Sequence, residues 1–150
     1  MPTRLKDFVT TVVAVVEPET TAMVTAQLMR QHHIGALVVV DTEQQAFPVG
    51  IVTDRDLVLA LMAEGLDPAM FTAGDIMSVE LVTATPDMDV MEAVTLMRTN
   101  RLRRLVITDD EGRLVGIVTL EDLLELMTRE LAALASAAIG ARDREFEQRR

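Results

Sequence analysis

Residues 49–57 read VGIVTDRDL, and residues 115–123 read VGIVTLEDL. Seven of these nine positions are identical, and the two differences fall at the sixth and seventh. Upstream the match continues at a separation of 68 residues, which pairs Pro18 with Pro86 and Asp41 with Asp109. Such self-similarity indicates that one unit of about 60 residues occurs twice in the chain.

Both copies alternate strand-like and helix-like patterns. Short β-branched runs that end at a proline indicate strands, apolar residues at helical spacing indicate amphipathic helices, and two apolar runs around a polar turn indicate a hairpin. The first copy is predicted to form strand 12–16, helix 21–31, strands 36–40 and 48–53, and helix 54–64. The second copy is predicted to form strand 81–84, helix 89–99, strands 105–108 and 113–119, and a helix from 120 to about 138.

The predicted domain organisation is repeat 1 over residues 1–65, a linker over 66–72, repeat 2 over 73–130 and a C-terminal extension over 131–150. Gly65 and Pro68 stop a helix and start a turn between the copies. One unit of this size buries too little apolar surface alone. We therefore expect an α/β (α+β) module in which two β-α-β-β-α repeats pack sheet to sheet with pseudo-twofold symmetry. The charged segment 142–150 is predicted to be solvated or a frayed helix.

Composition narrows the class of protein. The net charge of −10 argues against nucleic-acid binding, which requires a basic face. The chain has no cysteine, so disulfides and thiolate metal sites are excluded. No apolar run approaches the roughly 20 residues of a membrane span, and the N-terminus lacks the pattern of a secretion signal. These features predict a cytoplasmic protein without a membrane span.

The repeated segment carries a possible nucleotide site at the junction of strand and helix. Thr53 and Thr119 stand where the first turn of a helix presents free backbone N–H groups, which favour a phosphate. Asp56 and Asp122 follow three residues later, on the same helix face, where a carboxylate can accept hydrogen bonds from ribose hydroxyls. Glycine lacks a Cβ and can let a ligand approach the strand, which makes Gly50 and Gly116 further candidates.

The same Thr-x-x-Asp spacing has a purely structural interpretation. It is close to a capping box, in which the threonine caps a backbone N–H and the acidic residue reaches back to the cap. For an isolated motif, capping is the commoner role. The duplication, together with a glycine three residues upstream of each threonine, favours nucleotide binding here, and both roles can coexist.

Taken together, these elements resemble the CBS domain in the tandem arrangement called a Bateman module. The resemblance covers residues 4–128 and rests on the Gly-Ile-Val-Thr-x-x-Asp-Leu motif in both copies and on Asp75-Ile76-Met77 before the second. It implies a regulatory, non-enzymatic protein, a homodimer, and clefts that bind AMP, ADP, ATP or S-adenosylmethionine. Its effector would be an attached or partner enzyme, channel or transporter.

The resemblance also implies roles for individual residues. The threonine of the motif would contact phosphate and the aspartate would hold the ribose. Adenine would lie against apolar groups of the opposite copy, near Ala14 or Val82, and against Ile34 or Leu102.

One difference between the copies predicts unequal clefts. The second copy has Arg101-Leu102-Arg103-Arg104 where the first has His33-Ile34-Gly35-Ala36. Because arginine holds phosphate oxygens in a bidentate fork, Arg103 and Arg104 predict that the cleft beside Asp122 is the stronger phosphate site. Arg55 is the candidate to supply charge to the other cleft.

Two alternative functions remain. In the first, apolar helix faces hold a dimer or partner together without a ligand, because the helix carries a longer apolar stripe than one small unit requires. This stripe consists of Leu123, Leu124, Met127, Leu131 and Leu134. In the second, acidic clusters such as 109–111 sense Mg²⁺, since hard cations prefer carboxylate oxygens. The sequence contains no recognisable catalytic motif.

Overall fold

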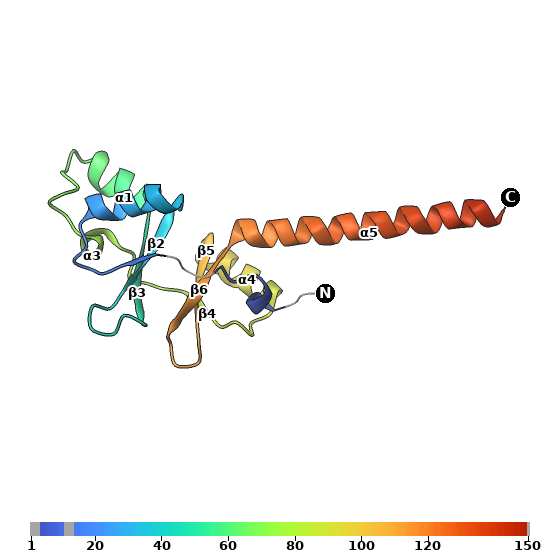
Figure 1. Cartoon of the computed structure of the whole chain (residues 1–150), viewed down its shortest axis with the longest axis horizontal. Helices are drawn as coiled ribbons and strands as arrows, with labels where there is room; N and C mark the ends of the chain where they lie inside the picture. The colour runs from blue at the N-terminus through green and yellow to red at the C-terminus, as the bar shows by residue number, and fades with distance from the viewer. Residues whose placement is uncertain (1–3, 11–13, 150) are drawn as a thin grey trace.

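The computed structural model describes residues 4–10 and 14–149. Each copy forms a three-stranded sheet flanked by helices, so the predicted β-α-β-β-α order is confirmed (Figure 1). The first copy contains β1 (Val15–Val16), α1 (Ala22–His32), β2 (Ala36–Val40), β3 (Pro48–Thr53), α2 (Asp54–Leu57) and a π-helical turn η2 (Val58–Met62). The second contains β4 (Thr83–Ala84), α4 (Val90–Asn100), β5 (Arg104–Thr108), β6 (Leu114–Thr119) and α5 (Leu120–Gln148). A 3-10 turn η1 (Leu5–Asp7) precedes the first copy, and a short helix α3 (Ala73–Ile76) precedes the second.

The two sheets have the same topology and the same register. In each, the first strand runs parallel to the second, and the second pairs with the third as an antiparallel hairpin. Val38 pairs with Ile51 in the first sheet, and Val106 pairs with Ile117 at the equivalent place in the second. The ends of β3 and β6, where the candidate threonines lie, therefore have matching surroundings within each sheet.

The two sheets pack face to face, as the sequence predicts. Val38 and Val40 from β2 and Val106 from β5 form a buried cluster, against which Ile51 and Ile117 pack. Each sheet also has its own core on the other face, under its helices. Each sheet thus packs one face against the other sheet and the opposite face against its own helices, so the two copies form one unit.

The segment that opens each copy packs against the core of the other copy. Leu5 is fully buried in the core of the second copy, and its backbone N–H donates to the carbonyl of Met88 at 3.0 Å. Ala73, in α3, is fully buried in the core of the first copy, and its N–H donates to the carbonyl of Thr20 at 2.7 Å. The core of each copy is therefore completed by the opening segment of the other copy.

Gly50 and Gly116 lie against these exchanged segments rather than against an open cleft. Ile117 forms two backbone hydrogen bonds with Thr10, and a Cβ on Gly116 would lie 2.5 Å from the Thr10 carbonyl oxygen. In the other copy, Ile51 pairs with Ser78, and a Cβ on Gly50 would lie 3.0 Å from the Ser78 carbonyl oxygen. The two glycines therefore admit a crossing backbone of the chain itself, which corrects the expectation that they face a ligand.

Several element boundaries differ from the predicted ones. The first strand of each copy is shorter than predicted, with β4 starting at Thr83, while residues 12 and 13 of the predicted strand 12–16 lie outside the described residues. The helix predicted over 54–64 passes into a π-helical turn after Leu57. The charged segment 142–150, predicted to be solvated or a frayed helix, is exposed over its described residues and helical as far as Gln148. The long helix stands out from the rest of the molecule (Figure 1).

No helix in the described part of the chain combines the length and the apolar character that crossing a bilayer requires.

Replacing Gly116 with alanine tests the crossing of the N-terminal segment. We expect Gly116→Ala to lower the free energy of unfolding by about 1–3 kcal/mol, because the new methyl group must displace the Thr10 backbone. Gly140→Ala is the matched control, since nothing lies within 4 Å of its Cβ position and it stands inside a helix. Urea denaturation measures both variants. Equal stability of Gly116→Ala and wild type would contradict the crossing, and the control should not be destabilised.

Candidate functional site

Thr119 and Asp122 form a capping box at the start of α5. The Thr119 hydroxyl accepts a hydrogen bond from the backbone N–H of Asp122 at 3.1 Å, and the Asp122 carboxylate accepts one from the N–H of Thr119 at 3.2 Å. Thr53 and Asp56 make the same pair of bonds at the start of α2, at 3.2 and 2.8 Å. The structural interpretation of the motif is thus correct for both copies. A ribose bound at either carboxylate would therefore donate to a group that already accepts a hydrogen bond from the backbone N–H of the cap.

A cavity of about 270 Å³ opens beside Asp122, between the two copies. This volume is slightly below the usual range of small-molecule sites, about 300–1,000 Å³, and suits a ligand smaller than a dinucleotide. The first copy and its N-terminal segment contribute Thr10, Ala14, Ile34, Gly35, Ala36 and Val38, and the second contributes Arg104, Ile117, Thr119 and Asp122. Five predicted site residues therefore meet here: Ala14, Ile34, Arg104, Thr119 and Asp122.

The chemistry of the lining is divided between its two sides. Ala14, Ile34 and Ile117 supply apolar surface, which a flat heterocycle can cover. Asp122 supplies acceptors for hydroxyl groups, and Arg104 supplies a permanent positive charge with planar donors for an anion. One cavity thus combines apolar surface, a carboxylate that can accept hydrogen bonds from hydroxyl groups, and a guanidinium that can donate hydrogen bonds to an anion.

Arg103 turns away from this cavity. Its guanidinium pairs with Glu121 on α5, and both side chains are largely exposed. The backbone N–H of Glu121 and then the Arg103 guanidinium hold the pKa of Glu121 below its ordinary value. The sequence predicted two arginines beside Asp122, whereas in the structure Arg104 lines the cavity and Arg103 belongs to a surface ion pair.

Gly35 also lines the cavity, although the repeated motif did not predict it as a site residue. A Cβ at this position would lie 3.4 Å from Nη2 of Arg104 and 3.1 Å from Oδ2 of Asp54. Its lack of a side chain therefore leaves room for the Arg104 guanidinium at the cavity wall. The signal was present in the sequence, because Gly35 stands at the position that Arg103 occupies in the second copy.

The remaining predicted residues lie elsewhere. Val82 and Leu102 are partly buried and pack against the core of the second copy. Arg55 is exposed on α2, beside Asp56. By the internal symmetry, Val82 and Leu102 correspond to Ala14 and Ile34, so they mark the equivalent place near Asp56. At that place, the position equivalent to Gly35 is occupied by Arg103 of the second copy.

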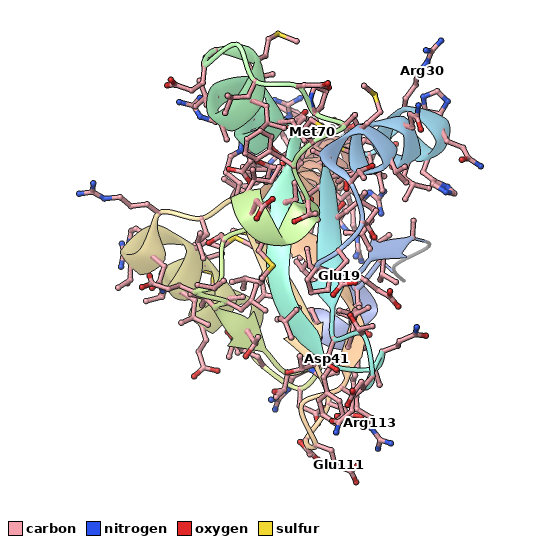
Figure 2. The ribbon with its side chains drawn as sticks, turned by 90° about the vertical axis from the view of Figure 1, so that its left-hand side faces the viewer. Glu19, Arg30, Asp41, Met70, Glu111 and Arg113 are labelled. Carbon is pink, nitrogen blue, oxygen red and sulfur yellow. The ribbon has the colours of Figure 1, made fainter. Side chains whose placement is uncertain are left out.

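The acidic clusters are engaged in local structure. Asp109 accepts hydrogen bonds from the backbone N–H groups of Arg113 and Glu111, and the bond from Arg113 is the main reason that the pKa of Asp109 lies below its ordinary value. Glu111 pairs with Arg113 at 2.6 Å, and Figure 2 shows the two side chains together at one end of the molecule. Across residues 4–10 and 14–149, no three histidine or acidic side chains group together as a metal site. These contacts weigh against the Mg²⁺ alternative.

Comparison with known proteins shows what the chain is similar to. A family model described as the CBS domain matches it twice, over residues 5–63 and 73–129. The CBS domain-containing protein YhcV of Bacillus subtilis is 42% identical over 132 residues, which cover 87% of this chain and 91% of YhcV. Protein MK0525 of Methanopyrus kandleri is 45% identical over 109 residues, which cover 73% of this chain and 55% of MK0525. The chain thus spans nearly all of one relative and about half of the other.

A solved structure adds a likeness in three dimensions. The CBS domain pair of protein MJ0100, in complex with 5′-methylthioadenosine and S-adenosyl-L-methionine, matches with a TM-score of 0.73 and 29% identity. The match covers 83% of this chain and 99% of that one.

Substitutions at Thr119 separate its capping role from its other contacts. We expect Thr119→Val to lower the free energy of unfolding by about 1 kcal/mol, because valine keeps the shape but loses the acceptor for the Asp122 N–H. Thr119→Ser keeps the acceptor and should stay close to wild type. Chemical denaturation of both variants, with Thr53→Val as the matched variant in the other copy, measures this difference. A stability of Thr119→Val equal to that of Thr119→Ser would show that the cap contributes nothing.

Proposed function

The chain belongs to the CBS domain family, and from this premise we propose that it is a regulatory module that binds an adenosine-type ligand in the cavity beside Asp122. The observation that carries the proposal is the meeting of Asp122, Thr119 and Arg104 from one copy with Ala14 and Ile34 from the other. Neither copy alone holds this set.

Each part of an adenosine ligand has a counterpart in the cavity. Adenine would lie against Ala14 and Ile34, which offer apolar contact. The ribose hydroxyls would donate to the Asp122 carboxylate, which is partly buried and so binds them more strongly than an exposed carboxylate would. A 5′ phosphate would extend toward Arg104 and the Thr119 hydroxyl. The structure of the MJ0100 domain pair supports this ligand class, because it holds two adenosine derivatives.

The ligand class within the adenosine derivatives follows from charge. Arg104 favours a substituent that is anionic, such as the phosphates of AMP, ADP or ATP or the carboxylate of S-adenosylmethionine. The cavity of about 270 Å³ favours the smaller of these ligands. We therefore rank AMP first among the nucleotides.

Regulation would follow from the position of the site between the copies. A ligand that contacts both copies shifts their relative arrangement only if it binds one arrangement more tightly than another. The effector, an enzyme or a transporter, and the cytoplasmic location both remain predictions. An interaction module without a ligand is the second candidate, favoured by the exposed apolar stripe on α5.

Paired aspartate variants test the site. In calorimetric titrations of nucleotide-free protein, we expect Asp122→Ala to weaken AMP binding on the order of 100-fold, because two hydrogen bonds to a charged acceptor are lost. Asp56→Ala removes the same capping bond in the other copy and is the matched control, so it should leave this affinity nearly unchanged. Equal losses in both variants would contradict the assignment to one cleft. Absence of heat with wild type and all adenosine ligands would contradict the function itself.

An arginine variant tests the selection by charge. We expect Arg104→Ala to weaken AMP binding by about 10- to 100-fold, the loss typical of a hydrogen bond between charged groups. Binding of uncharged 5′-methylthioadenosine should change much less. Arg103→Ala is the control, since that side chain pairs with Glu121 outside the cavity. If both ligands lose affinity equally in Arg104→Ala, Arg104 is not the anion contact.

A further inference from the structure

The outer part of α5 is a helix without a partner within the chain as described. The helix has 29 residues and is about 43 Å long. Every residue from Leu131 to Arg149 is exposed, and Figure 1 shows this part projecting from the body. Residues 131–141 read LAALASAAIGA and contain no charge, although they face water on all sides. A helix with so little polar surface is ordinarily buried against another element.

The apolar residues of α5 follow a spacing of alternating three and four residues. This spacing is the a and d pattern of a two-stranded coiled coil. The side chains at these positions are large near the body and small farther out: Leu124, Met127, Leu131 and Leu134, then Ala138 and Ala141. The large residues are strongly exposed, Leu131 at 67% and Leu134 at 60%.

We propose that residues 127–145 of α5 pair with the same segment of a second copy of this chain, as an antiparallel coiled coil. In the antiparallel arrangement an a position faces a d position of the partner. With Leu134 opposite Ala138 of the second copy, Leu131 lies opposite Ala141, and each leucine is matched by an alanine. Large residues facing small ones let the two helices interdigitate closely. The leucine half of each helix thus packs against the alanine half of its antiparallel partner.

Charges flanking the seam select the same arrangement. In this register the g positions Glu130 and Arg144 of the two copies face each other, which gives two pairs of opposite charge by symmetry. A parallel pair would instead place Glu145 against its own copy in the seam and Arg144 beside Arg149. Both of these parallel contacts join like charges. The uncharged stretches 131–141 also coincide in the antiparallel register. Glu145 then lies opposite Met127 at each end of the paired segment, rather than opposite a second Glu145.

Sedimentation of the full chain tests the pairing. We expect Leu134→Lys to halve the mass of the wild-type particle, because a charge in the seam breaks the coiled coil. Ser136→Lys is the matched control, since Ser136 lies on the opposite face of the same turn and should keep the wild-type mass. The thermal unfolding of the body should be the same in both variants. An unchanged mass in Leu134→Lys, or a monomeric wild type whose face awaits some other protein, overturns the proposal.

Engineered cysteines test the direction of the pair, and the chain has no cysteine of its own. Leu134→Cys and Ala138→Cys proteins of different tag length are mixed and equilibrated in a glutathione buffer. The antiparallel register predicts disulfides between the two different proteins. Disulfides within each variant alone would indicate a parallel pair and overturn the proposed register.

A charge exchange provides a second readout of the register. We expect Glu130→Arg to weaken the dimer, and the double variant Glu130→Arg with Arg144→Glu to restore it. Failure of the second substitution to restore the dimer would contradict the facing of these two positions.

Discussion

The reciprocal packing of the opening segments is the constraint on which the rest of the structure depends. Leu5 is buried in the core of the second copy, and Ala73 is buried in the core of the first. Removing either segment would leave a hole in the other copy, so neither copy is complete alone. The same crossing carries Thr10 over Gly116 and brings Ala14 to the cavity beside Asp122. The exchange that completes the cores therefore also builds the site from both copies.

The internal symmetry of the fold is broken at the site. The two capping boxes have almost the same geometry, yet the surroundings differ where Gly35 stands opposite Arg103 in the alignment of the copies. Gly35 leaves space for Arg104 in the cavity, whereas Arg103 is held by Glu121 at the surface. The backbone frame is thus the same in both copies, while single side chains differ at the cavity wall. Because Thr119 caps the start of α5, the proposed ligand and the proposed coiled coil act on one helix.

Much of this architecture follows from local patterns in the sequence. The two hairpins were predicted to within one residue, because their β-branched runs and polar turns are strong local signals. The aspartates and threonines of the site follow from the duplicated motif. The role of Gly116 was wrong, because only the tertiary contact with Thr10 shows what lies above it. Arg103 and Arg104 are adjacent in sequence, yet Arg103 lies just before β5 and pairs with Glu121, whereas Arg104 opens the strand and lines the cavity. Sequence proximity alone did not show that they would have different partners.

Nuclear magnetic resonance can show whether one ligand contacts both copies at once. The measurement is a titration of isotope-labelled, nucleotide-free protein with AMP, followed at each backbone amide. We expect the amides around Ala14 and Ile34 in the first copy to shift together with those around Thr119 and Asp122 in the second. Both groups should give one common dissociation constant. Shifts confined to one copy, or centred on Thr53 and Asp56 instead, would contradict this expectation.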